Sequence, residues 1–71
     1  MKKYVIYSED LNGYAGKLYT VRGEQYLGIC DKAETKKYSS FKRAKNALER
    51  IQLRTGFNYG LRIDAEEVVE G

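Results

Sequence analysis

The chain has 71 residues, a net charge of +3 at pH 7, no histidine and a single cysteine, Cys30. These counts exclude a disulfide within these residues and zinc sites built from cysteine and histidine. The chain also lacks histidine, the residue most often used in general acid–base catalysis. A chain of this length forms one domain, residues 1–71, and buries only about 60% of the surface that it exposes when unfolded.

The first ten residues, MKKYVIYSED, have a charged start but only a short apolar run, so we expect no signal peptide. No stretch of the sequence approaches the roughly 20 apolar residues of a membrane span, so we expect no membrane partner. The absence of a cysteine pair is typical of a reducing compartment. These features together predict a cytoplasmic protein.

A first strand is predicted over residues 2–8, KKYVIYS, which are rich in Tyr, Val and Ile. The segment EDLNGYAG, residues 9–16, follows, and we interpret it as turns because asparagine and glycine tolerate positive φ. A glycine-rich loop holds phosphate only where it leads into the N-terminus of a helix. GYAG leads into a predicted strand, so we do not interpret it as a phosphate loop.

A β-hairpin is predicted over residues 17–30. Its strands are KLYTVR, residues 17–22, and EQYLGIC, residues 24–30, and Gly23 permits a tight turn between them. Cys30 ends the second of these strands, where a lone cysteine is usually a small buried hydrophobic residue. We therefore assign Cys30 a structural role rather than a nucleophilic one.

One helix is predicted from Phe41 to Thr55, after the polar segment 31–37. Ser39 or Ser40 caps its start by accepting a backbone hydrogen bond, and Gly56 ends it. The spacing of 3.6 residues per turn gathers its apolar side chains on one stripe, which we expect to lie against the sheet. That stripe consists of Phe41, Ala44, Ala47, Leu48 and Ile51.

The segment FNYGLRI, residues 57–63, alternates apolar and polar residues and predicts a fourth strand with one buried face. We expect Phe57 or Tyr59, together with Leu61, to lie beneath the helix. The remaining segment, residues 64–71, predicts an acidic tail. The order βββαβ predicts an α+β fold in which one helix packs on a mainly antiparallel sheet.

Charge is distributed unevenly along the chain. Residues 36–54 contain seven basic residues and one acid, Glu49, for a net charge of +6, whereas the rest of the chain carries −3. A solvated helix face is normally charged, so these cations fit a surface with no ligand. A face of mixed sign is more usual, however, and Lys45–Glu49 is the one i,i+4 pair of opposite charge. The candidate partner-binding cations of the helix are Lys42, Arg43, Lys45, Arg50 and Arg54.

Seven tyrosines are a large number for so short a chain, and most of them fall on predicted strands. Some must face away from the helix, which predicts an exposed tyrosine cluster, with Tyr7 and Tyr19 as candidate binding residues. Aromatic side chains on an open sheet face stack on nucleic-acid bases or anchor a protein partner. Tyrosine also simply suits strands, so the ligand of such a cluster is left open.

The opening Lys-Tyr-Val-Ile run and a later small-residue and aromatic pattern before the predicted helix form a recognisable packing pattern. Its positions are Lys3, Tyr4, Val5, Ile6, Ala33, Tyr38, Ser39, Phe41, Ala44, Ala47 and Leu48. The pattern resembles short accessory proteins encoded by phages and prophages of Gram-positive bacteria. That resemblance implies a counter-defence role of the kind played by anti-CRISPR proteins, some classes of which are similar in size and lack catalytic residues. It contains no site motif and therefore assigns no functional residue.

We therefore expect a non-enzymatic protein of phage or mobile-element origin that occupies or inhibits a host protein or nucleoprotein complex in the cytoplasm of the bacterial host. We expect no catalytic residue, cofactor or metal, and a homodimer is a further arrangement to consider. The carboxylates would mimic phosphates toward a basic groove, or the basic helix would meet nucleic acid or an acidic protein face. The alternative is a nucleic-acid-binding module that uses the basic helix, residues 41–55. Its contact residues would be Lys36, Lys37, Lys42, Arg43, Lys45, Arg50 and Arg54.

Overall fold

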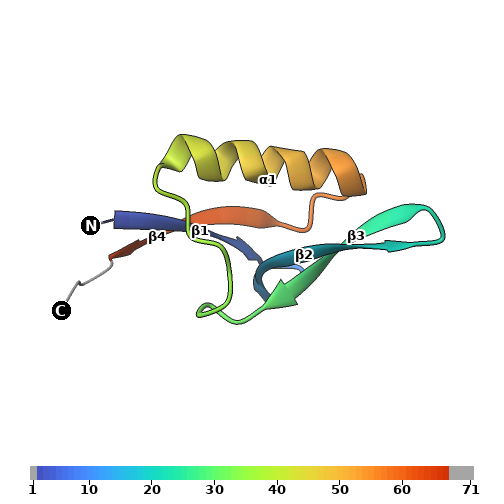
Figure 1. Cartoon of the computed structure of the whole chain (residues 1–71), viewed down its shortest axis with the longest axis horizontal. Helices are drawn as coiled ribbons and strands as arrows, with labels where there is room; N and C mark the ends of the chain where they lie inside the picture. Colours follow the sequence, from blue (N-terminus) through green and yellow to red (C-terminus); the bar gives the residue numbers. More distant parts are fainter. Residues whose placement is uncertain (1, 68–71) are drawn as a thin grey trace.

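The computed structural model describes residues 2–67, which form a four-stranded sheet covered by one helix (Figure 1). The elements are β1 (Lys2–Ser8), β2 (Gly13–Val21), β3 (Glu24–Cys30), α1 (Phe41–Thr55) and β4 (Leu61–Glu67). The strand order across the sheet is β3-β2-β1-β4, and each neighbouring pair is antiparallel. The predicted α+β fold and its βββαβ order are confirmed.

The helix carries the chain from one edge of the sheet to the other. The chain leaves β3 at one edge, follows α1 across a face of the sheet, and returns as β4 beside β1. Figure 1 shows α1 above the sheet, with the β2–β3 hairpin reaching past the C-terminal end of the helix. The fold is therefore elongated, with extents of 45 × 22 × 17 Å.

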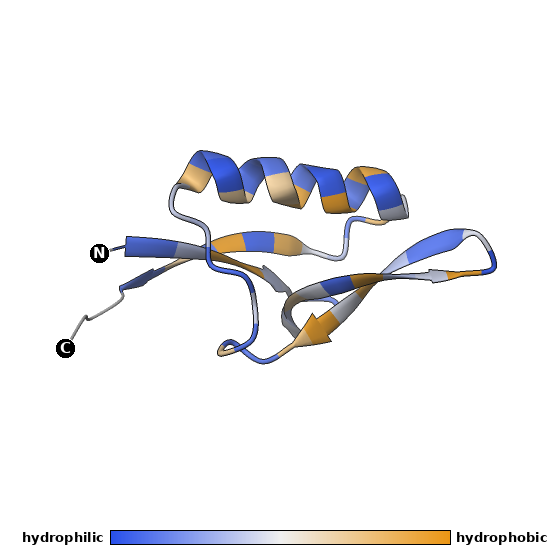
Figure 2. Cartoon of the chain, viewed as in Figure 1, coloured by the Kyte–Doolittle hydropathy of each residue, from blue (hydrophilic) through white to orange (hydrophobic). Residues whose placement is uncertain are grey.

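The core is centred on β1, the strand between β2 and β4. Val5 and Ile6 are both buried. Because neighbouring strand residues point to opposite faces, β1 must be covered on both sides. On the helix, Ala44 is fully buried, and the more hydrophobic side of α1 faces the sheet (Figure 2). This arrangement confirms the predicted helix face around Ala44.

Phe41 departs from the predicted apolar stripe, because 53% of its surface is exposed. It is the first residue of α1, and its ring meets the edge of the Tyr4 ring, with 6.0 Å between centroids and an interplanar angle of 78°. Phe41 thus packs against Tyr4 of β1 from the first turn of the helix and is not buried between α1 and the sheet. Leu48 and Ile51, further along the same stripe, are half-buried as expected.

Both ends of α1 are capped as the sequence predicts. The Oγ of Ser40, the N-cap, accepts a hydrogen bond of 3.2 Å from the Arg43 N–H. Gly56 adopts the left-handed conformation with φ 75°, and its N–H donates to the Gln52 carbonyl at 2.9 Å. Such caps satisfy backbone groups that a helix leaves without partners.

The interpretation of GYAG as turn residues is wrong, because β2 begins at Gly13 and includes the whole of this segment. The turn ends one residue earlier, at Asn12, whose φ is 57°. Gly13 already pairs with Ser8 of β1. The strand then contains a register shift between Ala15 and Leu18, and such a bulge bends the strand and redirects side chains.

The β2–β3 hairpin turns at Arg22 and Gly23, which have φ values of 51° and 81°. Two successive positive φ values are typical of the two-residue turn that matches the twist of antiparallel strands. Arg22 therefore belongs to the turn rather than to the strand predicted over residues 17–22. The predicted hairpin and its third strand, Glu24–Cys30, are confirmed.

The predicted strand over residues 57–63 is wrong in its first four residues. Tyr59 and Gly60 both have φ 59°, so the chain cannot remain extended there, and β4 begins at Leu61. Tyr59 is fixed by a hydrogen bond of 2.7 Å that the buried Ser8 Oγ donates to its carbonyl. The alternation of apolar and polar residues over residues 57–60 therefore belongs to a packed loop and not to a strand.

Two further expectations about this end of the chain change. Of the alternatives Phe57 and Tyr59, Phe57 is not the residue beneath the helix: it is about half exposed, and its ring stacks on Tyr26 with 6.2 Å between centroids, whereas Tyr59 and Leu61 are half-buried. The expected acidic tail is wrong for residues 64–67, which form the end of β4 beside β1. Residues 68–71 lie outside the described residues.

Replacing Ser8 by Ala is expected to lower the free energy of unfolding by about 1–3 kcal/mol. The Ser8 hydroxyl donates to the Tyr59 carbonyl and accepts from the Leu11 N–H at 3.1 Å, so the change leaves buried polar groups without partners. Urea denaturation measures the decrease. Ser39→Ala, at an exposed site, is the control and should stay within about 0.5 kcal/mol of the parent. Equal midpoints for the two variants would contradict this role.

Candidate functional site

Three of the candidate helix cations lie on one side of α1. At about 100° per residue, Arg43, Arg50 and Arg54 fall within about 40° of one another around the helix axis. Arg50 lies near Tyr38: burial raises the pKa of the Tyr38 phenol, and the nearby positive charge of Arg50 opposes that rise. The three arginines therefore line the side of α1 that faces the segment 31–40.

The other two candidate cations of the helix do not share this side. Lys45 is rotated about 160° from Arg43, next to Gln52, whose side-chain amide donates to the Asn58 carbonyl at 3.1 Å. Lys42 lies between the two sides, toward solvent. The structure thus separates the five predicted helix cations, and only the arginines form a common edge.

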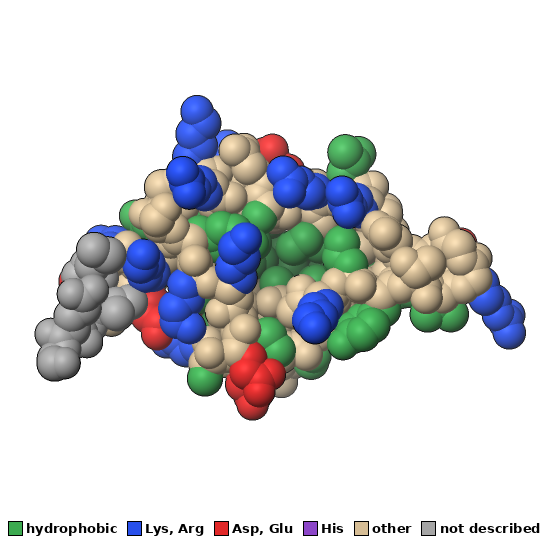
Figure 3. Space-filling model, in the orientation of Figure 1, with side chains coloured by type: hydrophobic (Ala, Val, Ile, Leu, Met, Phe, Trp, Pro, Cys, Tyr) green, Lys and Arg blue, Asp and Glu red, His purple; other side chains and the backbone are tan. Residues whose placement is uncertain are grey.

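One cation from another segment, Lys36, lies near the arginine edge, and Lys17 lies beside Lys36. The Lys36 Nζ lies over the Tyr38 ring, 5.4 Å from its centroid, and Arg50 acts on the same tyrosine. Lys36 and Lys17 line one hollow of ≈ 380 Å³ beside the β2–β3 hairpin. Figure 3 shows Lys and Arg side chains around a hollow that has hydrophobic side chains at its floor. We call this surface the basic face, and it consists of Lys17, Lys36, Arg43, Arg50 and Arg54.

Within residues 2–67, no cation of the basic face forms an ion pair with a carboxylate. Ion pairs lie elsewhere: Arg62 with Glu9 at 2.6 Å and with Asp64 at 3.2 Å, and Lys32 with Glu66 at 3.7 Å. One exposed acid, Glu34, lines the hollow between Lys17 and Lys36. The positive charge of the basic face is therefore largely uncompensated and directed to solvent.

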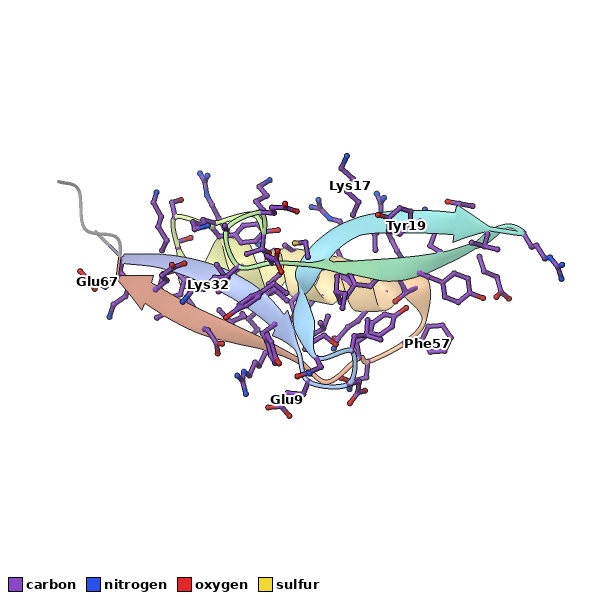
Figure 4. The ribbon with its side chains drawn as sticks, turned by 90° about the horizontal axis from the view of Figure 1, so that it is seen from below. Glu9, Lys17, Tyr19, Lys32, Phe57 and Glu67 are labelled. Atoms are coloured by element: carbon purple, nitrogen blue, oxygen red, sulfur yellow. The ribbon has the colours of Figure 1, made fainter. Side chains whose placement is uncertain are left out.

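The two candidate tyrosines have different environments. The Tyr7 ring lies under the Arg62 guanidinium at 4.7 Å, meets Tyr14 edge to face at 5.1 Å, and donates its hydroxyl to Asn12. Tyr7 is thus engaged within the fold. Tyr19 is 57% exposed and lines the same hollow as Lys17. Figure 4 shows Lys17 and Tyr19 toward one border of the sheet and Glu9 at the opposite border.

Comparisons of the chain with protein-family models, curated proteins and solved structures find no match. The basic face is therefore assigned from its own geometry and charge. Sequence reasoning missed Lys17, because it lies on a strand far from the basic run of residues 36–54. Lys17 lies within the register shift of β2 between Ala15 and Leu18, which sequence reasoning did not predict.

Clustered metal-ligating groups and thiols are few in the described part of the chain. No group of three or more His, Cys, Asp or Glu residues among residues 2–67 is placed to hold a metal ion. Cys30 is half-buried at the end of β3, with its Sγ 3.6 Å from the Ala15 carbonyl oxygen. Helix α1 is neither long nor apolar enough to cross a membrane.

A second surface lies at the C-terminal end of α1. Leu53 points to solvent with 85% of its surface exposed, and the half-exposed Phe57 lies close by in the chain. Both line a shallow hollow of ≈ 340 Å³, and the Phe57 ring stacks on the Tyr26 ring with an interplanar angle of 23°. We call Leu53 and Phe57 the apolar tip.

Cys30→Ala is expected to change the free energy of unfolding by less than about 1 kcal/mol, because a thiol is a weak donor and its site is only half-buried. Thr35→Val is the matched comparison. The buried Thr35 hydroxyl donates to the same Ala15 carbonyl at 2.8 Å, so its removal should cost about 0.5–1.5 kcal/mol. Urea denaturation ranks the two variants, and a larger destabilisation by Cys30→Ala than by Thr35→Val would contradict the assignment of a minor stabilising contribution to the half-buried thiol.

Proposed function

We propose that this protein is a non-enzymatic nucleic-acid-binding module and that the basic face is its contact surface for phosphate. The observation that supports this proposal is the convergence of cations from β2, the segment 31–40 and α1 on one surface, without carboxylate partners in the described part of the chain. A merely solvated helix face does not require cations of two other segments to gather beside it.

The chemistry of the basic face suits a phosphate backbone. Arginine guanidinium groups have a planar fork of donors that matches phosphate oxygens, and lysines act as point charges. Each phosphate that a protein neutralises releases condensed counterions, which favours association at low salt. The overall charge of the chain is only +3, so the local concentration of charge is the feature that favours this partner.

Binding is measured by fluorescence anisotropy with labelled oligonucleotides of mixed sequence over a range of salt concentrations. The double variant Arg43→Gln/Arg50→Gln should bind more weakly. The slope of log K against log salt should become shallower by about 0.7–0.9 for each phosphate that the variant no longer neutralises. Glutamine keeps helix propensity nearly level, so stability should change little.

The matched control is Lys42→Gln/Lys45→Gln, which removes the same charge from the same helix but off the basic face. It should retain most of the parent affinity, with the small decrease expected for long-range charge. Equal weakening by the two double variants would show that the net charge matters and the basic face does not. No measurable binding by the parent at low salt would overturn the proposal.

A second function is favoured by the apolar tip. A protein that occupies a host protein or nucleoprotein complex, as expected from the resemblance to phage accessory proteins, needs an apolar anchor that becomes buried on binding. Leu53 is almost fully exposed and Phe57 is supported by Tyr26, so this surface is ready for contact with little rearrangement. It lies apart from the hollow lined by Lys17 and Lys36, and both surfaces are compatible with one module.

Leu53→Glu tests this second function by placing a charge at the apolar tip. Asn46→Glu adds the same charge to the same solvent-facing stripe of α1, about two turns away, and serves as the control. In affinity capture from host cells with quantitative mass spectrometry, a specific partner should be retained by the parent and by Asn46→Glu but not by Leu53→Glu. Identical capture by all three proteins would argue against the apolar tip as a binding surface.

A further inference from the structure

Tyr19 lies on the sheet without an aromatic or hydrogen-bond partner among the described residues. A Cβ atom added at Gly28 would lie 2.2 Å from the Tyr19 Cε2 and 2.9 Å from its Cδ2, so the ring edge rests directly over the Gly28 backbone on β3. Within residues 2–67, the Tyr19 ring pairs with no other aromatic ring and its hydroxyl makes no hydrogen bond. The absence of a side chain at Gly28 thus leaves room for the Tyr19 ring, and more than half of the Tyr19 surface stays exposed.

The surroundings of Tyr19 combine apolar and positive groups. Lys17 lies within the bulge of β2, two residues before Tyr19, and Lys36 approaches the same hollow from the segment 31–40. Ile29 contributes a half-exposed aliphatic wall. Glu34 is the one acid that lines the hollow, opposed by these two lysines. An aromatic ring between cations is the arrangement that proteins use for a base and its flanking phosphates.

We infer that the basic face binds single-stranded nucleic acid in preference to a duplex, and that Tyr19 stacks on an unpaired base while Lys17 and Lys36 contact the backbone beside it. This inference rests on the proposed function and deepens it. In a duplex the faces of the bases are covered by their neighbours, so an aromatic ring gains a stacking partner only from an unstacked strand. A face built for duplex phosphates alone has no use for an exposed ring in its hollow.

The test compares anisotropy titrations of a labelled single strand, in DNA and RNA forms, with the matched hairpin duplex. The parent should bind the single strand more tightly. Tyr19→Ala should weaken single-strand binding by about 5- to 150-fold, the range equivalent to the ~1–3 kcal/mol of one stacked base, and should leave duplex binding nearly unchanged. Tyr19→Phe keeps the ring and should stay within about twofold of the parent.

Two further variants separate stacking from indirect effects. Phe41→Ala removes an aromatic ring of similar exposure at the far edge of α1 and should leave single-strand binding unchanged. Gly28→Ala keeps Tyr19 but displaces its ring, and it should weaken single-strand binding in the same direction as Tyr19→Ala. Circular dichroism confirms that each variant is folded.

The outcomes distinguish this inference from the proposed function. Absence of binding to either nucleic acid would overturn both. Duplex binding as tight as single-strand binding, with no effect of Tyr19→Ala, would leave the proposed function standing and overturn the inference. Equal weakening on both nucleic acids by Tyr19→Ala would also overturn it, because the ring would then not act through an unpaired base. Selective weakening on the single strand, with Tyr19→Phe intact, supports it.

Discussion

The left-handed conformation of Tyr59 is the constraint on which the arrangement of this fold depends. A non-glycine residue with positive φ costs free energy and persists only where its surroundings determine it. Here the carbonyl of Tyr59 accepts from the buried Ser8 hydroxyl, and its phenol oxygen accepts from the Leu27 N–H at 3.2 Å. One loop residue thereby joins the end of β1, the exit of α1 and the edge strand β3, and this joint determines where β4 begins.

The pairing between β1 and β2 is short. The two strands pair at Tyr7 and Ser8 and then separate, and Tyr38 takes the vacant position by exchanging two backbone hydrogen bonds with Tyr4, of 2.9 and 2.8 Å. This contact draws the segment 31–40 against the sheet and brings Lys36 and Tyr38 beside Arg50 of α1. The basic face is thus a consequence of the gap in the sheet as well as of the charged helix.

The surface along β1 and β4 differs from the basic face in whether its charged side chains have partners of opposite charge. Along β1 and β4, Arg62 is held by Glu9, Asp64 and the Tyr7 ring, so charge there is compensated within the molecule. On the basic face the cations lack carboxylate partners among the described residues, and Tyr19 has an exposed ring. A fold of this size has little stability to spare, so uncompensated charge and exposed rings on one surface are features that a binding role would explain.

Local chemistry determined much of the fold. The strands 2–8 and 24–30, the helix 41–55, its Ser40 and Gly56 caps and the hairpin turn follow from hydrophobic period, capping and turn residues that act over a few positions. The common edge of Arg43, Arg50 and Arg54 also follows from their spacing, because 3.6 residues per turn places them together on any regular helix. These features needed no knowledge of what lies elsewhere in the chain.

Only the tertiary structure decided the rest, because long-range contacts override local patterns. Residues 57–60 alternate as a strand does, yet hydrogen bonds with Ser8 and with Leu27 hold Tyr59 in a left-handed loop. GYAG has the composition of a turn, yet pairing with β1 and β3 extends it as β2. Lys17 and Lys36 lie far apart in sequence and meet only because a bulge redirects β2 and Tyr38 draws its segment against β1.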